Sequence, residues 1–305
     1  MSRTPLIAGI ELGGTKVACI LAGGPDEIRA EVRIDTTTPE ATLDAVTAQL
    51  KAWRDSLGFE AIGVASFGPL DVDPASATYG CVVNTSKAGW SGANLLERMR
   101  PFEVPTGFDT DVTAAALAEG RWGAARDLSS FAYVTVGTGV GVGCIVDGRP
   151  VRGLGHPEVG HLRVGRLKGA EGFAGVCPYH GDCVEGLASG PAIQARAGKS
   201  ADTLSGTDPA WDETVHALAG LCHNLVLTVL PRRILIGGGV GMGQAHLLPR
   251  VRRAFLESLN GYGVTPKIAA GIETFVAHPG LGDRAGPLGA VALGLDALAA
   301  IGPGR

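Results

Sequence analysis

The chain has 305 residues, 45 % of them hydrophobic and 18 % charged, so it is long enough for two ordinary domains and is not disordered. Its formal net charge of −4 gives no electrostatic reason to expect nucleic acid as a partner. Six cysteines are too few for a disulfide scaffold, and neither a signal-peptide pattern nor an apolar run of about 20 residues is found. We therefore expect a globular cytoplasmic protein that binds neither nucleic acid nor membrane.

The first part of the chain predicts a β-hairpin followed by alternating helices and strands. Two short apolar runs surround a Gly-Gly turn, which is the pattern of a hairpin. Thr38 and Pro39 give a helix cap and a first-turn proline. A later helix that begins at Asp111 can be capped by Asp109 or by Thr110. The expected elements are strands over 6–10, 17–21 and 62–65 and helices over 39–57 and 111–122.

The second part of the chain repeats the hairpin and then the alternation. Apolar runs over 131–136 and 140–146 surround the turn 137–139. The two hairpins align with Gly14 on Gly139, Val17 on Val142, Cys19 on Cys144 and Ile20 on Ile145, which indicates an internal duplication. The further expected elements are a helix over 209–229, a strand over 233–236, a Gly-rich turn over 237–243, a helix to 259 and a last helix over 287–300. Strands that alternate with helices indicate an α/β protein.

The duplication predicts two α/β domains. We place the smaller N-terminal domain at residues 1–115, before the second hairpin begins. The larger C-terminal domain is expected over 116–286. The last helix, about 287–303, is expected to pack back on the first domain.

A cluster of potential metal ligands follows Glu158. His161 comes three residues later, and Cys177, His180 and Cys183 lie within seven residues of one another in a stretch too rich in Gly and Pro to form a core. Two thiolates and two imidazoles make the tetrahedral N/S set that zinc prefers, and four protein ligands leave no position open for chemistry. The cluster therefore predicts a structural zinc site in a loop over 156–191.

Two other metal chemistries fit the pattern poorly. A zinc protease needs adjacent His and Glu and two His four residues apart on a helix, whereas Pro157 and Gly160 interrupt any helix here. A nucleic-acid zinc finger is also disfavoured, because basic residues do not cluster around the ligands and the chain is mildly acidic.

The glycine clusters indicate a nucleoside triphosphate site. They match neither the Walker loop nor the dinucleotide pattern. What remains is two hairpin turns and one strand-to-helix turn, and each can direct backbone N–H groups at an anion. Thr15 and Thr138 add hydroxyl donors, and Lys16 adds a cation.

With these motifs the chain resembles the ROK sugar kinases. The motifs are GIELGGTK at 9–16, TVGTGVG at 135–141, EVGH at 158–161 and GGG at 237–239. The resemblance implies a duplicated, ribonuclease-H-like (actin/hexokinase-like) α/β fold whose two domains enclose ATP and sugar in a cleft. The run CPYHGDCVEGLASGP at 177–191 and the Glu at position 11 are most similar to the bacterial fructokinase branch. Other branches usually have a third cysteine where this chain has His180.

The resemblance also implies residue roles. Asp111, in the first turn of a helix whose dipole favours a carboxylate, is expected to be the general base for the sugar hydroxyl. The family's usual Asn before it is Thr110 here. Glu158 and Asn84 are expected to bind the sugar, and His161 is expected to touch a hydroxyl while it also binds zinc.

The resemblance assigns the phosphate and nucleotide contacts as well. Mg²⁺ usually keeps several waters, so no dedicated protein cage is expected, and Glu11 is expected to hold it through water. The residues expected to contact ATP are Gly13, Gly14, Thr15, Lys16, Thr138, Gly139, Pro191, Gly237, Gly238 and Gly239. The expected cofactors are thus ATP, Mg²⁺ and a structural Zn²⁺.

The preferred function is ATP-dependent phosphorylation of fructose to fructose 6-phosphate. Kinases for mannose, glucose or an N-acetylhexosamine are the nearest alternatives. A sugar-sensing repressor of the same family would need an N-terminal helix-turn-helix, and the first expected strand at about Leu6 leaves no room for one. A filament or chaperone ATPase would not need Glu158 or the His/Cys cluster. By resemblance we expect a homodimer.

Overall fold

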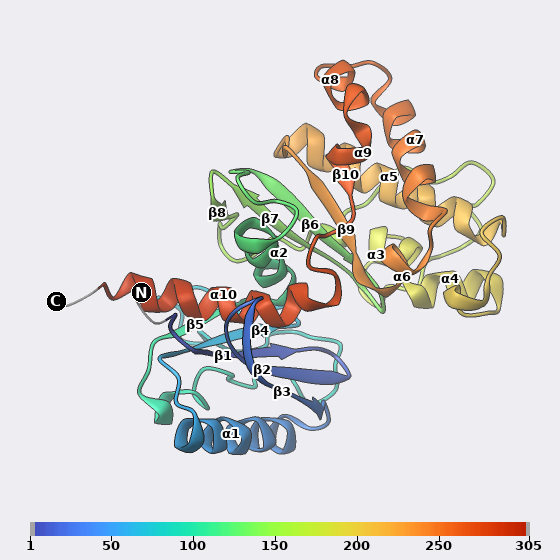
Figure 1. Cartoon of the computed structure of the whole chain (residues 1–305). Helices are drawn as coiled ribbons and strands as arrows, with labels where there is room; N and C mark the ends of the chain where they lie inside the picture. Colours follow the sequence, from blue (N-terminus) through green and yellow to red (C-terminus); the bar gives the residue numbers. More distant parts are fainter. Residues whose placement is uncertain (1–3, 303–305) are drawn as a thin grey trace. The chain divides into compact units, whose positions relative to one another are not determined.

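The computed structural model describes residues 4–302, which form two compact α/β units (Figure 1). The first unit takes the described residues up to Arg126, Val151–His156 and those from Asp283 onward, and the second takes Asp127–Pro150 and Pro157–Gly282. The expected division at residues 115/116 would cut helix α2 (Asp111–Trp122), which lies whole in the first unit. The short segment Val151–His156 also returns to the first unit.

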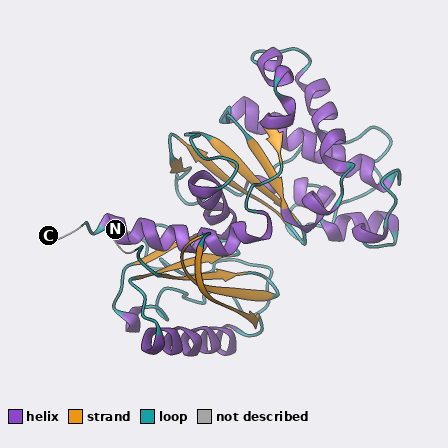
Figure 2. Cartoon of the chain, in the orientation of Figure 1, coloured by secondary structure: helices purple, strands orange, loops and turns teal. Residues whose placement is uncertain are grey.

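The first unit is built on a mixed five-stranded sheet with the order β3-β2-β1-β4-β5. Figure 2 shows the strands in orange. β2 pairs antiparallel with β1 and β3, whereas β4 pairs parallel with β1 and β5. The strands are β1 (Ile7–Leu12), β2 (Lys16–Gly24), β3 (Glu27–Asp35), β4 (Ala61–Ser66) and β5 (Thr106–Thr110). The predicted hairpin and the strand over 62–65 are present, whereas β3 and β5 were not predicted.

The second unit repeats this topology. β6 pairs antiparallel with β7 and parallel with β9, so the order β8-β7-β6-β9-β10 follows the pattern of the first sheet. The repeated strand order and pairing directions support the predicted duplication. The two hairpins differ in register, however, because Cys19 is in the third residue pair from its turn and Cys144 is in the fifth, so the predicted residue-by-residue alignment is not kept. The strands are β6 (Phe131–Val136), β7 (Val140–Val146), β8 (Arg149–Pro150), β9 (Ile234–Gly237) and β10 (Val276–Ala277).

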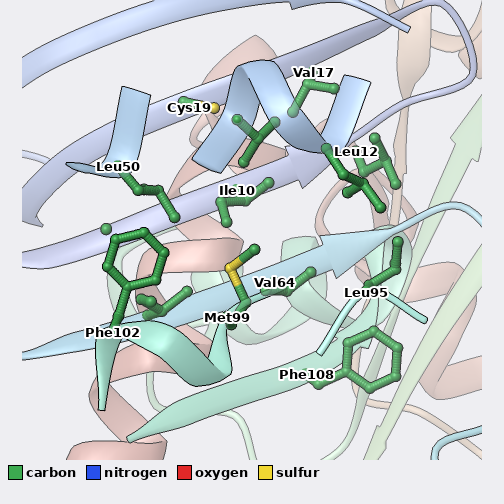
Figure 3. Packing of buried hydrophobic residues seen from close by; sticks show 14 of the residues in the cluster. Ile10, Leu12, Val17, Cys19, Leu50, Val64, Leu95, Met99, Phe102 and Phe108 are labelled. Carbon is green, nitrogen blue, oxygen red and sulfur yellow. The ribbon is translucent and has the colours of Figure 1, made fainter. Parts of the chain in front are cut away.

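One face of the first sheet is covered by helix α1 (Pro39–Ser56), as its sequence predicts. Thr38 caps the helix, because its hydroxyl accepts a hydrogen bond from the Ala41 N–H at 3.3 Å. The buried side chains recur at steps of three and four residues and pack on the alternate, inward-facing residues of the strands (Figure 3). This cluster includes Ile10, Leu12, Val17, Cys19, Leu43, Val46, Leu50, Trp53, Val64 and Phe108.

The other face of the first sheet carries helix α10 (Ala285–Ala300), which lies directly on the strand backbones. Gly9, Gly63 and Gly107 stand side by side in register on β1, β4 and β5. A Cβ at Gly63 would lie 1.8 Å from the carbonyl oxygen of Ala290, and one at Gly107 would lie 2.2 Å from that of Leu293. These contacts leave no room for side chains, so the row of glycines sets the position of α10.

The helices of the second unit are more numerous, and most of them are shorter than those of the first unit, although α5 is long. α5 packs against α3, α4 and α7. The Gly-rich segment after β9 was expected as a turn and forms the short helix α6. The helices are α3 (Val184–Ala188), α4 (Gly190–Ala197), α5 (Ala210–Thr228), α6 (Gly238–Gly243), α7 (Leu247–Leu259), α8 (Thr265–Ala270) and α9 (Ile272–Phe275). Four single turns of 3-10 helix lie at Arg100–Phe102, Val159–His161, Ala201–Thr203 and Gly282–Arg284. In the described part of the chain, residues 4–302, no helix has the length and hydropathy to cross a membrane.

Gly63→Ala is expected to destabilise the fold strongly, because the added methyl group meets backbone atoms of α10 that cannot move without displacing the helix. The loss of unfolding free energy should reach or exceed the upper end of the usual range for overpacking, about 1–3 kcal/mol. Thermal unfolding measures this loss.

Gly172→Ala is the matched control, because a Cβ there meets nothing within 4 Å and the residue has no positive φ. Its effect should stay within about 1 kcal/mol. Equal losses in the two variants would show that the close approach of α10 does not limit stability.

Candidate active site and metal centre

The predicted base and the predicted magnesium ligand lie at one edge of the first sheet. Glu11 lies near the carboxyl end of β1, and Asp111 begins α2 directly after β5. Because β1, β4 and β5 run parallel, their carboxyl ends share an edge, where α/β proteins commonly bind ligands. Thr110 caps α2, since its hydroxyl accepts from the Thr113 N–H at 3.2 Å.

The environment of Asp111 suits proton transfer near neutral pH. Burial raises the pKa of this carboxyl from 3.8 to about 6, and the charge of Asp109 adds to the rise. The backbone N–H of Val112, which donates to Oδ1 at 2.8 Å, partly opposes it. A carboxyl with this pKa is ionised at pH 7 yet remains a competent proton acceptor.

Glu11 is the second carboxylate of this edge. Burial and the charge of Asp111 raise its pKa to about 7, and Arg33 works in the opposite direction. Its carboxylate lies against the first turn of α10, where a Cβ on Gly286 would meet Oε1 at 1.9 Å. A cation placed beside two such carboxylates would favour their ionised forms, so this edge can hold Mg²⁺.

The turn between β1 and β2 carries the predicted phosphate contacts, and Gly14, Thr15 and Lys16 are exposed on it. The Gly13 N–H donates to the carbonyl oxygen of Lys16 at 3.0 Å, which closes the turn. Thr36, directly after β3, also holds the turn, because its hydroxyl donates to the Gly13 carbonyl at 2.9 Å. The turn is therefore fixed through its carbonyl groups, and its exposed side is available to an anion.

Asn84 lies in a loop of the same unit. The residue is exposed and has a positive φ of 47°. The loop ends at Trp90, which is fully buried and donates from its indole nitrogen to the Thr37 carbonyl at 3.0 Å. Lys87, between them, donates to the Gly14 carbonyl at 2.5 Å and joins the loop to the phosphate turn.

A buried ion pair beside the base was not predicted. Asp109 was considered as a cap for α2, but its carboxylate pairs instead with Arg152 from the segment Val151–His156. Asp109 is 2 % exposed, and burial raises its pKa while Arg152 lowers it. The pair holds this segment beside the start of α2.

In the second unit the turn over residues 137–139 is surrounded by helix N-termini. Gly190, the first residue of α4, donates its N–H to the Gly137 carbonyl at 2.7 Å, and Pro191 follows it. Gly238 begins α6 so close to β6 that a Cβ there would lie 2.5 Å from the carbonyl oxygen of Val136. The predicted nucleotide contacts Thr138, Gly139, Pro191, Gly237, Gly238 and Gly239 thus gather at one end of this sheet.

Glu185 is a further residue of this region that the sequence motifs did not single out. It lies in α3, and its Oε2 accepts a hydrogen bond from the Val140 N–H at 3.0 Å. A Cβ on Gly139 would lie 2.6 Å from the same oxygen. Glu185 thus fixes the end of the turn over residues 137–139. The sequence signal that could have identified it was its position two residues after the predicted metal ligand Cys183.

The predicted sugar ligand Glu158 lies beside the same turn. Glu158 precedes the 3-10 turn Val159–His161, and within that turn a Cβ on Gly160 would lie 1.8 Å from the Val140 carbonyl oxygen. The Glu158 Oε2 lies 3.9 Å from the His161 Nε2. The close approach of Gly160 holds Glu158 near the phosphate turn.

The four predicted metal ligands come together. Their ligand atoms all lie within 4.8 Å of one another. The His161 Nδ1 lies 3.6 Å from the Cys177 Sγ and 3.5 Å from the Cys183 Sγ, and the His180 Nδ1 lies 3.7 Å from the Cys177 Sγ. Tetrahedral zinc, with bonds of about 2.3 Å to sulfur and 2.05 Å to nitrogen, separates such atoms by about 3.6 Å. The donor set therefore fits zinc in both chemistry and spacing.

Salt bridges attach the metal loop to helix α5. Arg166 pairs with Asp182, next to Cys183, at 3.2 Å and with the buried Glu213 of α5 at 2.7 Å. The Arg166 guanidinium also donates to the carbonyls of Ala170 and Phe173 at 2.7 and 2.8 Å. These contacts order the loop between its first and last metal ligands.

The predicted site residues form two groups, one in each unit. The first unit holds the carboxylates Glu11 and Asp111, the turn 13–16 and Asn84, and the second holds the turn 137–139, Glu158 and the metal ligands. Two duplicated mixed sheets with glycine-rich hairpin turns define the actin/hexokinase-like class of α/β proteins.

Within that class the chain belongs to the ROK family, whose model matches residues 7–297. The fructokinase of Zymomonas mobilis is 42 % identical over 298 residues, which cover 94 % of this chain and 96 % of that protein. The fructokinase of Pediococcus pentosaceus is 37 % identical and covers 96 % of this chain and 99 % of its own length. The ROK hexokinase of Thermus thermophilus has the same fold, with a TM-score of 0.78 at 26 % identity over 95 % of this chain and 98 % of its own.

Arg152→Met is expected to destabilise the first unit, because it leaves the Asp109 carboxylate buried without its cation. Leaving a buried polar group without its partner lowers the free energy of unfolding by about 1–3 kcal/mol. We expect a value in the lower half of this range, because Arg152 is partly exposed. Since burial raises the Asp109 pKa, the loss should be full at neutral pH and should shrink as pH falls and the carboxyl becomes protonated. Chemical denaturation at pH 7 and pH 5 measures both the loss of stability and its dependence on pH.

Two further variants test the cause of the loss. Adding Asp109→Asn to Arg152→Met should restore part of the stability, since the amide carries no charge. Arg149→Met, at an exposed arginine in β8, should change little. A double variant as unstable as the sum of the single ones would contradict the ion-pair explanation.

Proposed function

We propose that the chain is a fructokinase that transfers the terminal phosphoryl group of ATP to D-fructose and forms fructose 6-phosphate. The observation that carries this proposal is that Asp111, a buried carboxyl whose pKa burial raises to about 6, begins α2 at the same sheet edge that carries the exposed turn of Gly14 and Thr15. Membership of a sugar-kinase family and the names of the relatives support the activity.

Fructose is favoured over other hexoses by the pattern of relatives. Fructokinases from four bacteria are 35–42 % identical to the chain. The kanosamine kinase of Amycolatopsis mediterranei is 32 % identical, and an N-acetylmannosamine kinase of Escherichia coli is 29 % identical over a smaller part of the chain. A coupled assay of ADP release across fructose, mannose, glucose and N-acetylhexosamines tests the assignment, which fails if fructose is not the best substrate.

The residues divide the chemistry between them. Asp111 accepts the proton of the attacking sugar hydroxyl, and Asn84, Glu158 and His161 orient the sugar. The backbone and hydroxyl groups of the two hairpin turns receive the phosphates. Glu11 would hold Mg²⁺ through water, and the ion when bound neutralises charge on the phosphates.

Asp111→Asn should lower kcat by at least about a hundredfold, because the amide cannot accept the hydroxyl proton. Mg·ATP affinity should stay within a small factor, which calorimetry measures. Asp55→Asn, at an exposed position of α1, is the matched control. Turnover near that of the unmodified chain would overturn the assignment of the base.

The pH profile provides an independent test of the same carboxyl. The base must be ionised, and burial raises its pKa to about 6. The value of kcat/KM for fructose should therefore be constant above this pH and fall about tenfold for each unit below it. A profile that stays flat down to pH 5 would contradict the assignment.

We also propose that His161, Cys177, His180 and Cys183 hold one structural Zn²⁺. The spacing of the four donor atoms and the mixed N/S chemistry support this proposal. A closed four-ligand zinc supplies no chemistry and stabilises the loop that carries Glu158.

Cys177→Ser should remove the metal and lower the melting temperature, since a ligand present at about a hundred times its Kd stabilises by about 2.7 kcal/mol. Elemental analysis should find one zinc per chain before the change. The KM for fructose should rise because Glu158 lies on the same loop. Chelation should destabilise the unmodified chain but leave the variant unaffected.

Cys81→Ser is the matched control, because Cys81 and Cys177 are buried to the same degree and Cys81 lies outside the metal cluster. It should keep its zinc. Loss of zinc from both variants, or from neither, would contradict the proposed set of zinc ligands.

On the resemblance to the family we further propose a cytoplasmic homodimer. ATP and sugar phosphates are intracellular metabolites, which supports the location. Light scattering after size-exclusion chromatography tests the assembly, and a mass of one chain across micromolar concentrations would exclude the dimer.

A further inference from the structure

We propose that Lys87 is a phosphate-binding residue whose ammonium group contacts the terminal phosphate of ATP at the turn between β1 and β2. This inference rests on the proposed kinase function. The Lys87 Nζ donates to the Gly14 carbonyl at 2.5 Å, so a full positive charge lies at the turn. An ammonium group has three N–H donors, and those not used by the carbonyl can donate to phosphate oxygens.

The backbone beneath this lysine is anchored. The Trp90 N–H donates to the Lys87 carbonyl at 3.2 Å, and the Trp90 ring is fully buried. The ring packs edge-on against Phe67 at 5.3 Å between centroids. The Lys87 N–H also donates to the Thr85 hydroxyl at 3.3 Å. The ammonium group thus reaches the turn from a fixed base, which limits the entropy lost when it binds a ligand.

Lys16, the cation expected from the sequence, approaches from a different side. Its neighbour Val17 belongs to the cluster beneath α1, so Lys16 itself points to the α10 side of the sheet. There it stands opposite Asp35 in the β2–β3 ladder. The loop of Lys87 packs on the α1 side, because Trp90 belongs to the same cluster as Val17. Lys87 is thus the cation that approaches the turn from the α1 side, where its ammonium group donates to the Gly14 carbonyl.

A cation in this place acts on the group that is transferred. In phosphoryl transfer, negative charge is spread over the terminal phosphate, and catalysis depends on positioning and neutralising it. Asn84, a proposed sugar contact, lies three residues before Lys87 in the same loop. One anchored loop therefore supplies both a sugar contact and a phosphate contact. Because ADP lacks the terminal phosphate, Lys87 should distinguish ATP from ADP.

The test compares the binding of two nucleotides to the whole chain. Calorimetry measures the binding of Mg·AMPPNP, a non-hydrolysable ATP analogue, and of Mg·ADP to the unmodified chain and to Lys87→Met. The variant should bind AMPPNP about tenfold to a hundredfold more weakly, as expected for a charge-assisted hydrogen bond, and ADP within about twofold. Lys87→Arg, which keeps the charge, should lose less affinity for AMPPNP. Lys51→Met, at an exposed position of α1, should lose no affinity for either nucleotide.

A residue that only positions the turn would give a different result. Equal weakening of both nucleotides, or of neither, would overturn the proposal. A raised KM for fructose with unchanged AMPPNP binding would assign Lys87 to the sugar and would also overturn it. Melting curves verify that each variant is folded, and Lys87→Gln replaces Lys87→Met if the latter is not. Failure of the kinase function itself would appear separately, as no hexose-dependent ADP release by the unmodified chain.

Discussion

The contact of α10 with bare strand backbone is the constraint on which the first unit depends. Packed layers are normally separated by two sets of side chains, about 10 Å between sheets. Here Gly9, Gly63 and Gly107 remove the side chains from three adjacent strands at one level, and backbone atoms of the helix occupy that space. Each glycine costs about 0.5–1 kcal/mol of strand stability, so the close packing that it permits must offset this cost.

The same helix determines where the two carboxylates of the site lie. Gly289 meets the backbone of Ala114 in α2, where a Cβ would lie 2.4 Å away, and Gly286 meets the carboxylate of Glu11. α10 therefore places both the first turn of α2, which begins with Asp111, and the side chain at the end of β1. The effect of the Asp111 charge on the pKa of Glu11 follows from this packing. A helix that contributes none of the predicted site residues thus sets the spacing of these two carboxylates.

Local signals were sufficient to predict much of the fold. Thr38 and Pro39 marked the start of α1, and the repeated pattern of two apolar runs around a glycine turn indicated the duplication, although not its residue-by-residue register. β3 was missed because its residues alternate only between half-buried and exposed, and charged residues occupy much of it. The division at 115/116 was misplaced for a different reason, since the packing of α2 on α10, far away in sequence, decides to which unit the helix belongs.

The limit of prediction from local sequence is clearer still for the candidate site. The roles predicted for Asp111 and Glu158 came from the family resemblance, and those of the metal ligands came from residue type and spacing, whereas the sequence did not single out Lys87, Arg152 or Glu185. Each acquires its role from one contact with a residue 73, 43 or 45 positions away.

Val140 shows why such roles leave only a faint trace in sequence. Its N–H donates to the Glu185 carboxylate, while its carbonyl lies against Gly160, so the second hairpin turn is held through the backbone groups of Val140 and not through its side chain. Any side chain at position 140 that fits the strand would preserve those contacts. What the arrangement does require is the absence of side chains at Gly139 and Gly160. Glycines that permit close approach, more than charged residues, are therefore the sequence record of how this turn is positioned.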